Sequence, residues 1–470
     1  MRLIAYMKPY AHWVIFALLL VLGLTAFDLY RPMLVGDAID TFGANGDYDV
    51  IIATAIKYAV VLALSFAFNI AQTWILQKTG QNIILQMRKD LYRHIQSLGS
   101  RYFDITPVGK LVTRVTNDVE ALNEMYSGIL VQLFRNIVKI VGLAGVMLVL
   151  DVRLAAISFV LMPLVIGLTV LCQKIARNIY RLYRTRLTDI NTFLSEHLSG
   201  MKIIQIFGRQ ERKFEEFHDK NTKLYKAFYR EMLMYAVFRP LIYILSILSL
   251  MIVLWFGSRN VFDEIISVGT LYIFSNYIRS FFDPIQELAE QFSTLQSSIA
   301  SAEKIFTVMD EDEFIPEIEN PKQPDKITGK IEFDHVWFAY DGENYVLKDV
   351  SFVINPGEKV AFVGATGAGK SSILNLIGRY YDIQKGHIYI DGIDIRQLSK
   401  KQLRSAIGQM QQDVFIFEGD VAYNIRLNDD DITDAQVKAA AEYVNASHFI
   451  EKLPQGYHEP VTERGATFSA

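Results

Sequence analysis

The sequence has 470 residues, a formal net charge of −4, a hydrophobic content of 51% and a mean hydropathy of +0.20. That length exceeds one ordinary domain, so we expect at least two, and the hydropathy is high for a soluble protein. The slight excess of acidic residues argues against a nucleic-acid partner, which would favour a strongly basic domain. Cys172 is the only cysteine, so an intrachain disulfide is excluded.

Apolar runs long enough to cross a bilayer, about 20 residues each, recur through the first ~290 positions. A buried helix of a soluble protein explains any single run, but their number favours membrane spans, with membrane lipid as a partner. The predicted spans are Trp13–Val35, Ile51–Ile75, Val131–Leu150, Leu154–Leu171, Tyr235–Phe256 and Ile265–Phe282.

Charged residues orient these spans. The loop Gly36–Val50 carries acids but no lysine or arginine, whereas Lys78–Leu130 and Gln173–Arg239 are rich in basic residues. By the positive-inside rule, the two basic segments and both termini belong in the cytoplasm. Their helical spacing predicts membrane helices extended into the cytosol. The first breaks at Phe103–Gly109, and the second through Ser199-Gly200 and Phe207-Gly208. The breaks are either surface turns or tips that press on a cytosolic domain.

Few polar residues interrupt the apolar runs. The notable ones are Asp28, Arg31 and Asn69, together with Asn136 and Lys139 near the start of the third span. Because a polar group in lipid is costly, such residues usually face a protein interior or a water-filled path. For Asp28 and Arg31 we expect either a role in the substrate pathway or a role at a helix end or in packing. Aromatic residues of the last two spans line an apolar cavity, form an interfacial belt or face lipid; they are Tyr243, Trp255, Tyr272, Tyr277, Phe281 and Phe282.

The composition changes at Asp310, where an acidic, proline-bearing stretch predicts a linker over 310–329. An α/β pattern follows. The predicted helix is Asp434–Val444, and the predicted strands are Lys330–Phe338, Lys348–Ile354, Lys359–Val363, His387–Ile390 and Ile407–Asp413.

The run GATGAGKSS, directly after Lys359–Val363, matches the phosphate-binding pattern of Gly, four residues, Gly, Lys, then Ser or Thr. Glycines let backbone N–H groups point at phosphate oxygens, Lys370 adds a charge, and the Ser371 hydroxyl is placed to bind Mg²⁺. A following helix, Ser371–Arg379, adds the positive end of its dipole. A chance glycine-rich turn is the alternative. The predicted nucleotide-binding residues are Gly364, Thr366, Gly367, Ala368, Gly369, Lys370, Ser371 and Ser372.

Two further residues are candidates for the nucleotide site. Tyr340 follows the first strand and precedes a turn, so its ring either stacks on a planar base or is a rim aromatic. Gln412 lies at the end of an apolar strand, where its uncharged oxygen suits Mg²⁺ or an attacking water. By spacing alone, the Gln412 signal is weak.

In this order and spacing, the motifs resemble those of ATP-binding cassette (ABC) exporters, specifically bacterial half-transporters of the multidrug type. The similar segments are the intracellular loops Phe103–Leu122 and Ser195–Phe217, the adenine-stacking loop Phe338–Phe352, and the Q-loop Met410–Ile425. The resemblance implies a membrane all-α six-helix transmembrane domain plus an α/β P-loop (RecA-like) nucleotide-binding domain, the latter incomplete. Expected boundaries are 1–309 for the transmembrane domain, 310–329 for the linker and 330–470 for the nucleotide-binding part.

The resemblance also implies ATP-driven efflux of amphipathic small molecules, multidrug or lipid-like, across the plasma membrane. The cofactors would be ATP and Mg²⁺, with Tyr340 stacking on adenine and with Ser371 and Gln412 contacting the metal. Segments Phe103–Gly109 and Ile206–Glu211 would be coupling helices that dock on the nucleotide-binding domains. Each half-transporter requires a second one.

The C-terminus departs from the family pattern. Glu463–Ala470 looks like the approach to the signature motif, and we expect the chain to be a fragment that contains no catalytic residue and does not hydrolyse ATP alone. The final Phe-Ser-Ala is similar to subunits of heterodimeric exporters and favours a heterodimer over a homodimer. The alternatives are an exporter of peptides or lipid-linked glycans, or a non-catalytic subunit or fragment.

Overall fold

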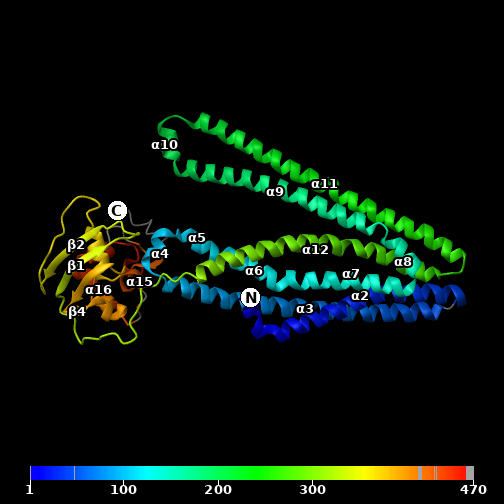
Figure 1. Cartoon of the computed structure of the whole chain (residues 1–470), viewed down its shortest axis with the longest axis horizontal. Coiled ribbons are helices and arrows are strands. Elements are labelled where there is room, and N and C mark those ends of the chain that lie inside the picture. The colour runs from blue at the N-terminus through cyan, green and yellow to red at the C-terminus, as the bar shows by residue number, and fades with distance from the viewer. Residues whose placement is uncertain (1, 47, 411–414, 428, 430, 462–470) are drawn as a thin grey trace. The chain divides into compact units, whose positions relative to one another are not determined.

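The computed structural model describes residues 2–46, 48–410, 415–427, 429 and 431–461. The chain divides into two compact units, Met1–Phe314 and Ile315–Ala470. In Figure 1 the first unit consists of long helices, and the second holds the strands together with short helices.

The first unit is helical through most of its described length. Its elements are α1 (Arg2–Met7), η1 (Lys8–Tyr10), α2 (Ala11–Asn45), α3 (Tyr48–Ser97), α4 (Ser100–Ile105), α5 (Val108–Thr113), η2 (Arg114–Asp118), α6 (Val119–Glu124), η3 (Met125–Ile129), α7 (Leu130–Leu150), α8 (Val152–Phe159), α9 (Met162–Ser199), α10 (Met201–Ile206), α11 (Gln210–Phe262) and α12 (Val268–Met309). Of these, η2 and η3 are π-helical turns.

Five helical runs within the described residues are long and apolar enough to cross a membrane: Arg2–Gly43, Tyr48–Ser97, Val108–Leu150, Val152–Ser199 and Gln210–Phe262. They contain the first five predicted spans. The sixth coincides with the start of α12, where Asn276, Arg279 and Asp283 lower the hydropathy. Phe274 and Ile278 of α12 are nevertheless fully buried, in a core shared with α7, α8, α9 and α11. Helix α12 therefore buries one apolar face in the core of this unit.

The aromatic residues of the last two spans have more than one environment. Tyr277, Phe281 and Phe282 are buried in the core of the helical unit, and the Tyr277 hydroxyl donates a 2.5 Å hydrogen bond to the carbonyl oxygen of Leu29. Tyr243 and Trp255 are exposed on α11, where they are free to face lipid or a partner. No single alternative, whether an apolar cavity, an interfacial belt or contact with lipid, therefore describes all of these aromatic residues.

Helices α9 and α11 form a hairpin that diverges from α7 and α12 and turns at α10 (Figure 1). Apolar side chains are exposed at the turn, including Ile203, Ile206 and Phe207. Gly208 adopts a left-handed backbone (φ 57°), which lets the chain reverse before α11. The second predicted break is thus a helix-to-helix turn with an apolar tip.

The second unit combines two small sheets with short helices. Its elements are β1 (Ile331–Phe338), β2 (Leu347–Ile354), α13 (Lys370–Ile377), β3 (Lys385–Ile390), β4 (Ile393–Asp394), η4 (Ile395–Gln397), α14 (Lys400–Ser405), β5 (Gly419–Asp420), α15 (Val421–Arg426), α16 (Asp434–Tyr443), α17 (Ser447–Ile450), η5 (Gly456–His458) and β6 (Pro460–Val461). One sheet has the antiparallel order β2-β1-β3-β4, and β5 pairs with β6.

Two predicted strands are not strands in the described residues. Lys359–Val363 leads into the phosphate loop without pairing to a neighbour, and Val363 is 89% exposed. Residues 407–410 are likewise irregular, and 411–414 lie outside the described residues. Local apolar sequence favours extended backbone at both places. A strand also requires a hydrogen-bonded neighbour, and such a buried parallel strand requires cover on both faces.

Candidate functional site

The phosphate loop lies between the extended segment ending at Val363 and the first turn of α13. Gly367 and Gly369 both have φ of 88°, a left-handed backbone that favours glycine. At Gly369 a Cβ atom would also lie 2.6 Å from a methyl carbon of Leu347. Backbone conformation and close packing together therefore explain why glycine occupies position 369.

The Lys370 ammonium lies over the loop it belongs to. Its Nζ donates hydrogen bonds to the carbonyl oxygens of Gly364 (2.9 Å) and Ala365 (2.8 Å). Lys370 is also the first residue of α13, so its charge and the positive end of the helix dipole lie close together. The loop residues Thr366, Gly367 and Ala368 are exposed. This combination suits the binding of an anionic phosphate chain.

The two serines after Lys370 have different environments. Ser371 is exposed in the first turn of α13, where its hydroxyl is a suitable hard oxygen ligand for Mg²⁺. Ser372 is 4% exposed, and its hydroxyl lies 3.0 Å from that of Tyr340. Tyr340 thus lies beside the phosphate loop, with its ring edge-to-face against Phe338 (4.7 Å) and Tyr381 (5.1 Å). The remaining candidate, Gln412, lies outside the described residues.

A layer of charged and polar side chains joins three helices of the first unit. Asp28 of α2 pairs with Arg31 of the same helix and lies 3.4 Å from Arg135 of α7. The buried Asn136 of α7 donates a 2.9 Å hydrogen bond to Glu287 of α12. We call these residues, with Lys139 and Asp283, which also interact electrostatically, the charged layer.

Sequence reasoning identified only part of this layer. Asp28 and Arg31 interrupt the first apolar run, and Asn136 and Lys139 lie near the start of the third, so these four were recognisable. Glu287 lies beyond the predicted sixth span, so no local signal connected it to the membrane part. A 3.2 Å hydrogen bond between Gln291 and Gln132 extends the layer along α12 and α7.

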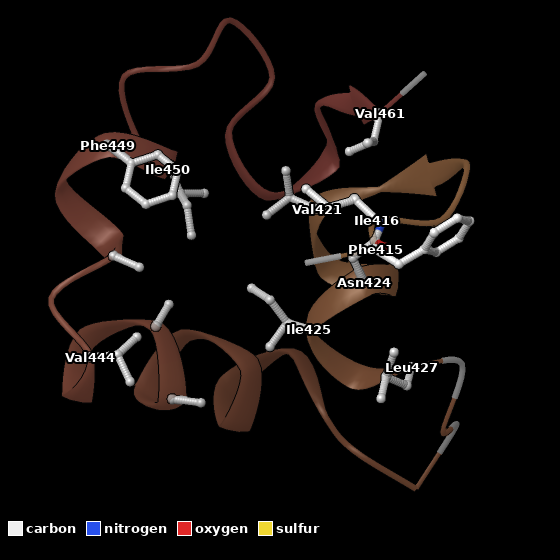
Figure 2. Close-up of a pocket in the computed structure, with 13 residues that line it drawn as sticks. Phe415, Ile416, Val421, Asn424, Ile425, Leu427, Val444, Phe449, Ile450 and Val461 are labelled. Carbon is white, nitrogen blue, oxygen red and sulfur yellow. The ribbon is translucent and has the colours of Figure 1, made fainter. Parts of the chain in front are cut away.

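An apolar pocket of about 490 Å³ lies in the second unit (Figure 2). It lies among α15, α16 and α17, and the side chains of Val421, Ile425 and Ile450 point into it. None of its lining residues belongs to the phosphate loop. The pocket is therefore suited to an apolar group from a protein or lipid and not to the phosphates.

Comparison with known proteins covers both parts of the chain. Residues 14–285 match the family described as ABC transporter transmembrane region, and residues 347–469 match the family described as ABC transporter. The first match covers more than half of the chain and includes α2 to α11 and the start of α12. The second includes the whole phosphate loop.

Curated bacterial relatives match most or all of this chain. The Streptococcus pneumoniae protein "Putative ABC transporter ATP-binding protein exp8" is 37% identical over all of this chain and 80% of its own length. The Bacillus subtilis "Probable multidrug resistance ABC transporter ATP-binding/permease protein YheH" is 35% identical over 88% of this chain and 62% of its own length. The "ATP-dependent lipid A-core flippase" of Desulfotalea psychrophila is 30% identical over 97% and 79%. The chain therefore belongs to the ABC transporters, as a bacterial exporter with a membrane domain and an ATP-binding domain in one chain.

Proposed function

We propose that the protein is one half of a dimeric exporter that uses ATP to move amphipathic small molecules, multidrug or lipid-like, out across the plasma membrane. The observation that supports it is the presence of two features in one chain. One is a phosphate loop whose carbonyls bind the Lys370 ammonium, and the other is a charged layer among apolar helices. Similarity to proteins named for multidrug resistance and for lipid A-core flipping supports this substrate range.

The charged layer is the proposed contact for the polar part of the substrate. Asp283 and Glu287 are exposed on α12, and an exposed carboxylate in a membrane helix needs water, a partner or a polar ligand. The half-buried Arg31 and Arg135 share the single carboxylate of Asp28. Groups of both signs would bind the head of an amphiphile, while apolar residues of the same helices bind its tail.

A second half-transporter is the proposed partner. Large apolar side chains such as Phe228 and Val237 are exposed along the α9–α11 hairpin. Burial of such a surface is favourable by about 25 cal/mol per Å². We favour a heterodimer because Phe-Ser-Ala, which lies outside the described residues, is similar to the sequence in subunits of heterodimeric exporters. In this assembly both termini and the ATP-binding part are cytoplasmic.

Nucleotide binding would involve the residues named above, with ATP phosphates on the loop, Mg²⁺ at Ser371 and Gln412, and adenine at Tyr340. We propose that the apolar tips around Phe103 and Phe207 act as coupling helices for the dimer's nucleotide-binding parts. Both side chains are exposed, at 39% and 70%.

The test is ATP-dependent uptake of an amphipathic fluorescent dye into inside-out membrane vesicles from cells that produce the chain and its partner. Uptake should need ATP and Mg²⁺ and should fall to background with Lys370→Ala. The matched control is Lys359→Ala, which removes an exposed lysine just before the loop. Undiminished uptake by Lys370→Ala vesicles would contradict the proposal. Co-purification from the native host would identify the partner as an identical or a different chain.

A further inference from the structure

The two units meet at the peptide bond between Phe314 and Ile315, and the chain is held by hydrogen bonds on both sides of it. On the first unit, the Gly99 amide donates a 2.8 Å hydrogen bond to the Glu313 carbonyl, and the Glu313 carboxylate pairs with Arg101 of α4 at 3.2 Å. The Phe314 ring packs edge-to-face on His94 of α3, with centroids 5.6 Å apart. The stretch predicted to be a 20-residue linker is thus already held in place at its fifth residue.

On the second unit, anchoring begins with the next residue. Lys400 Nζ donates a 2.8 Å hydrogen bond to the carbonyl of Ile315, and Arg379 donates one of 2.9 Å to the carbonyl of Pro316. The Lys400 amide binds the Glu317 carboxylate at 3.0 Å. We call residues 313–317 the strap, because both of its ends are tied down and little free chain remains between them.

Arg379 connects the strap to the nucleotide site. It lies two residues beyond the end of α13, the helix that begins with Lys370 of the phosphate loop. Its side chain is 3% exposed and is held by Asp382 through a 2.9 Å hydrogen bond from Nε. Its backbone has a φ of 46°, a left-handed conformation in which a non-glycine residue is strained. Burying a guanidinium on a strained backbone costs folding free energy, so we expect its several N–H donors to be needed at this position.

We propose that Arg379 is a positioning residue that ties the end of the phosphate-loop helix to the strap, so that nucleotide binding at Lys370 is transmitted to Gly99 and Arg101 at the start of α4. This inference rests on the proposed nucleotide binding. The route is mostly covalent: it runs through α13, Gly378 and Arg379, crosses one hydrogen bond, and continues through four residues of the strap. It requires no docking of a helix tip on another surface.

Hydrogen–deuterium exchange of the full chain in lipid nanodiscs, with its partner, tests the strap. The probe is a non-hydrolysable ATP analogue with Mg²⁺, and the reporter is the Gly99 amide. In wild type the analogue should protect the phosphate loop and slow exchange at Gly99 by about fivefold or more, the lower end of ordinary coupling between sites. In Arg379→Met the loop should remain protected while the change at Gly99 disappears. Arg379→Lys keeps the charge but not the forked donors, so it should restore little of the effect.

Lys326→Met, at an exposed residue of the same linker, is the matched control and should behave like wild type. If Arg379→Met does not fold, Lys400→Met removes the neighbouring anchor and should also weaken the response at Gly99. If the analogue protects the phosphate loop in wild type but does not slow exchange at Gly99, the proposed coupling through the strap is wrong, while nucleotide binding stands. An equal change in Arg379→Met would do the same. No protection of the loop would overturn the nucleotide site as well.

Discussion

The Tyr340 hydroxyl lies 3.0 Å from the hydroxyl of Ser372, and this contact joins the loop after β1 to the helix that follows the phosphate loop. Ser372 is buried and Tyr340 is half-buried, so the bond holds the tyrosine ring in one place beside the loop. The contribution of the ring to ATP binding and that of the hydroxyl to stability can therefore be measured separately.

Tyr340→Ala should weaken ATP binding by about two- to tenfold, because an aromatic contact contributes about 0.5–1.5 kcal/mol. Tyr340→Phe keeps the ring and should bind within about twofold of wild type, while losing about 1 kcal/mol of stability with the hydrogen bond. Titration with a fluorescent ATP analogue measures both. Tyr345→Ala removes another aromatic residue of the same loop as a control. Equal affinity in wild type and Tyr340→Ala would rule out stacking.

Lys370→Ala should reduce ATP affinity by at least about tenfold, which corresponds to about 1.4 kcal/mol. Among the described residues, its ammonium donates to two loop carbonyls near the surface, so the fold should persist without it. Equilibrium binding of a labelled analogue and a thermal melt separate the two effects. A variant that melts like wild type but binds ATP equally well would refute the assignment of Lys370.

Asp28→Asn should destabilise the helical unit by about 1–2 kcal/mol, because it leaves Arg31 and Arg135 without their shared carboxylate in a half-buried site. We expect the melting temperature in detergent to fall by a few degrees. Asp189→Asn breaks a more exposed pair, with Arg186 at 3.1 Å, and should have a smaller effect. The double change Asp28→Asn with Arg31→Gln should recover part of the loss. Equal melting temperatures for both single variants would show that the charged layer contributes no stability.

Asp394 should make the second unit sensitive to acid. Burial alone would raise the pKa of this carboxyl, but hydrogen bonds from Arg396 and His387 outweigh it and lower the pKa to about 2, from 3.8. Because the folded pKa is below the unfolded one, the stabilisation is present above about pH 4 and is lost as the pH falls through about 2. After allowance for solvent screening it is on the order of 1 kcal/mol.

Urea unfolding of wild type and Asp394→Asn checks this expectation. The wild type should be more stable at about pH 7, and the difference should shrink towards zero at about pH 2 to 3. Glu319→Gln changes an exposed acid of the same unit and should show no such convergence. A constant difference across this range would mean that Asp394 stabilises the unit by packing and not by its charge.

Much of this protein followed from local patterns. The phosphate loop is recognisable because its glycine, lysine and serine positions lie within nine residues of one another. In the structure Gly367 and Gly369 have φ of 88°, and Lys370 donates to the Gly364 carbonyl. The first five membrane helices follow from run length, since a bilayer sets a minimum span. Helix α16 and strands β1 to β3 also match their predicted ranges to within a few residues. The sixth span was less simple, because α12 combines polar positions with a buried apolar face.

The sequence alone determined the class of protein, its membrane part and its phosphate loop, because each is encoded by residues close together in the chain. Only the tertiary structure brought Asp28 to Arg135, 107 positions away, and Asn136 to Glu287, 151 positions away. It also brought Arg379 to the carbonyl of Pro316, which lies 63 positions earlier within the predicted linker. Such pairs are set by the packing of whole helices and loops, and no spacing within one segment specifies them. The same reason explains why Lys359–Val363 is not a strand: its residues favour one, but a strand exists only with a neighbour.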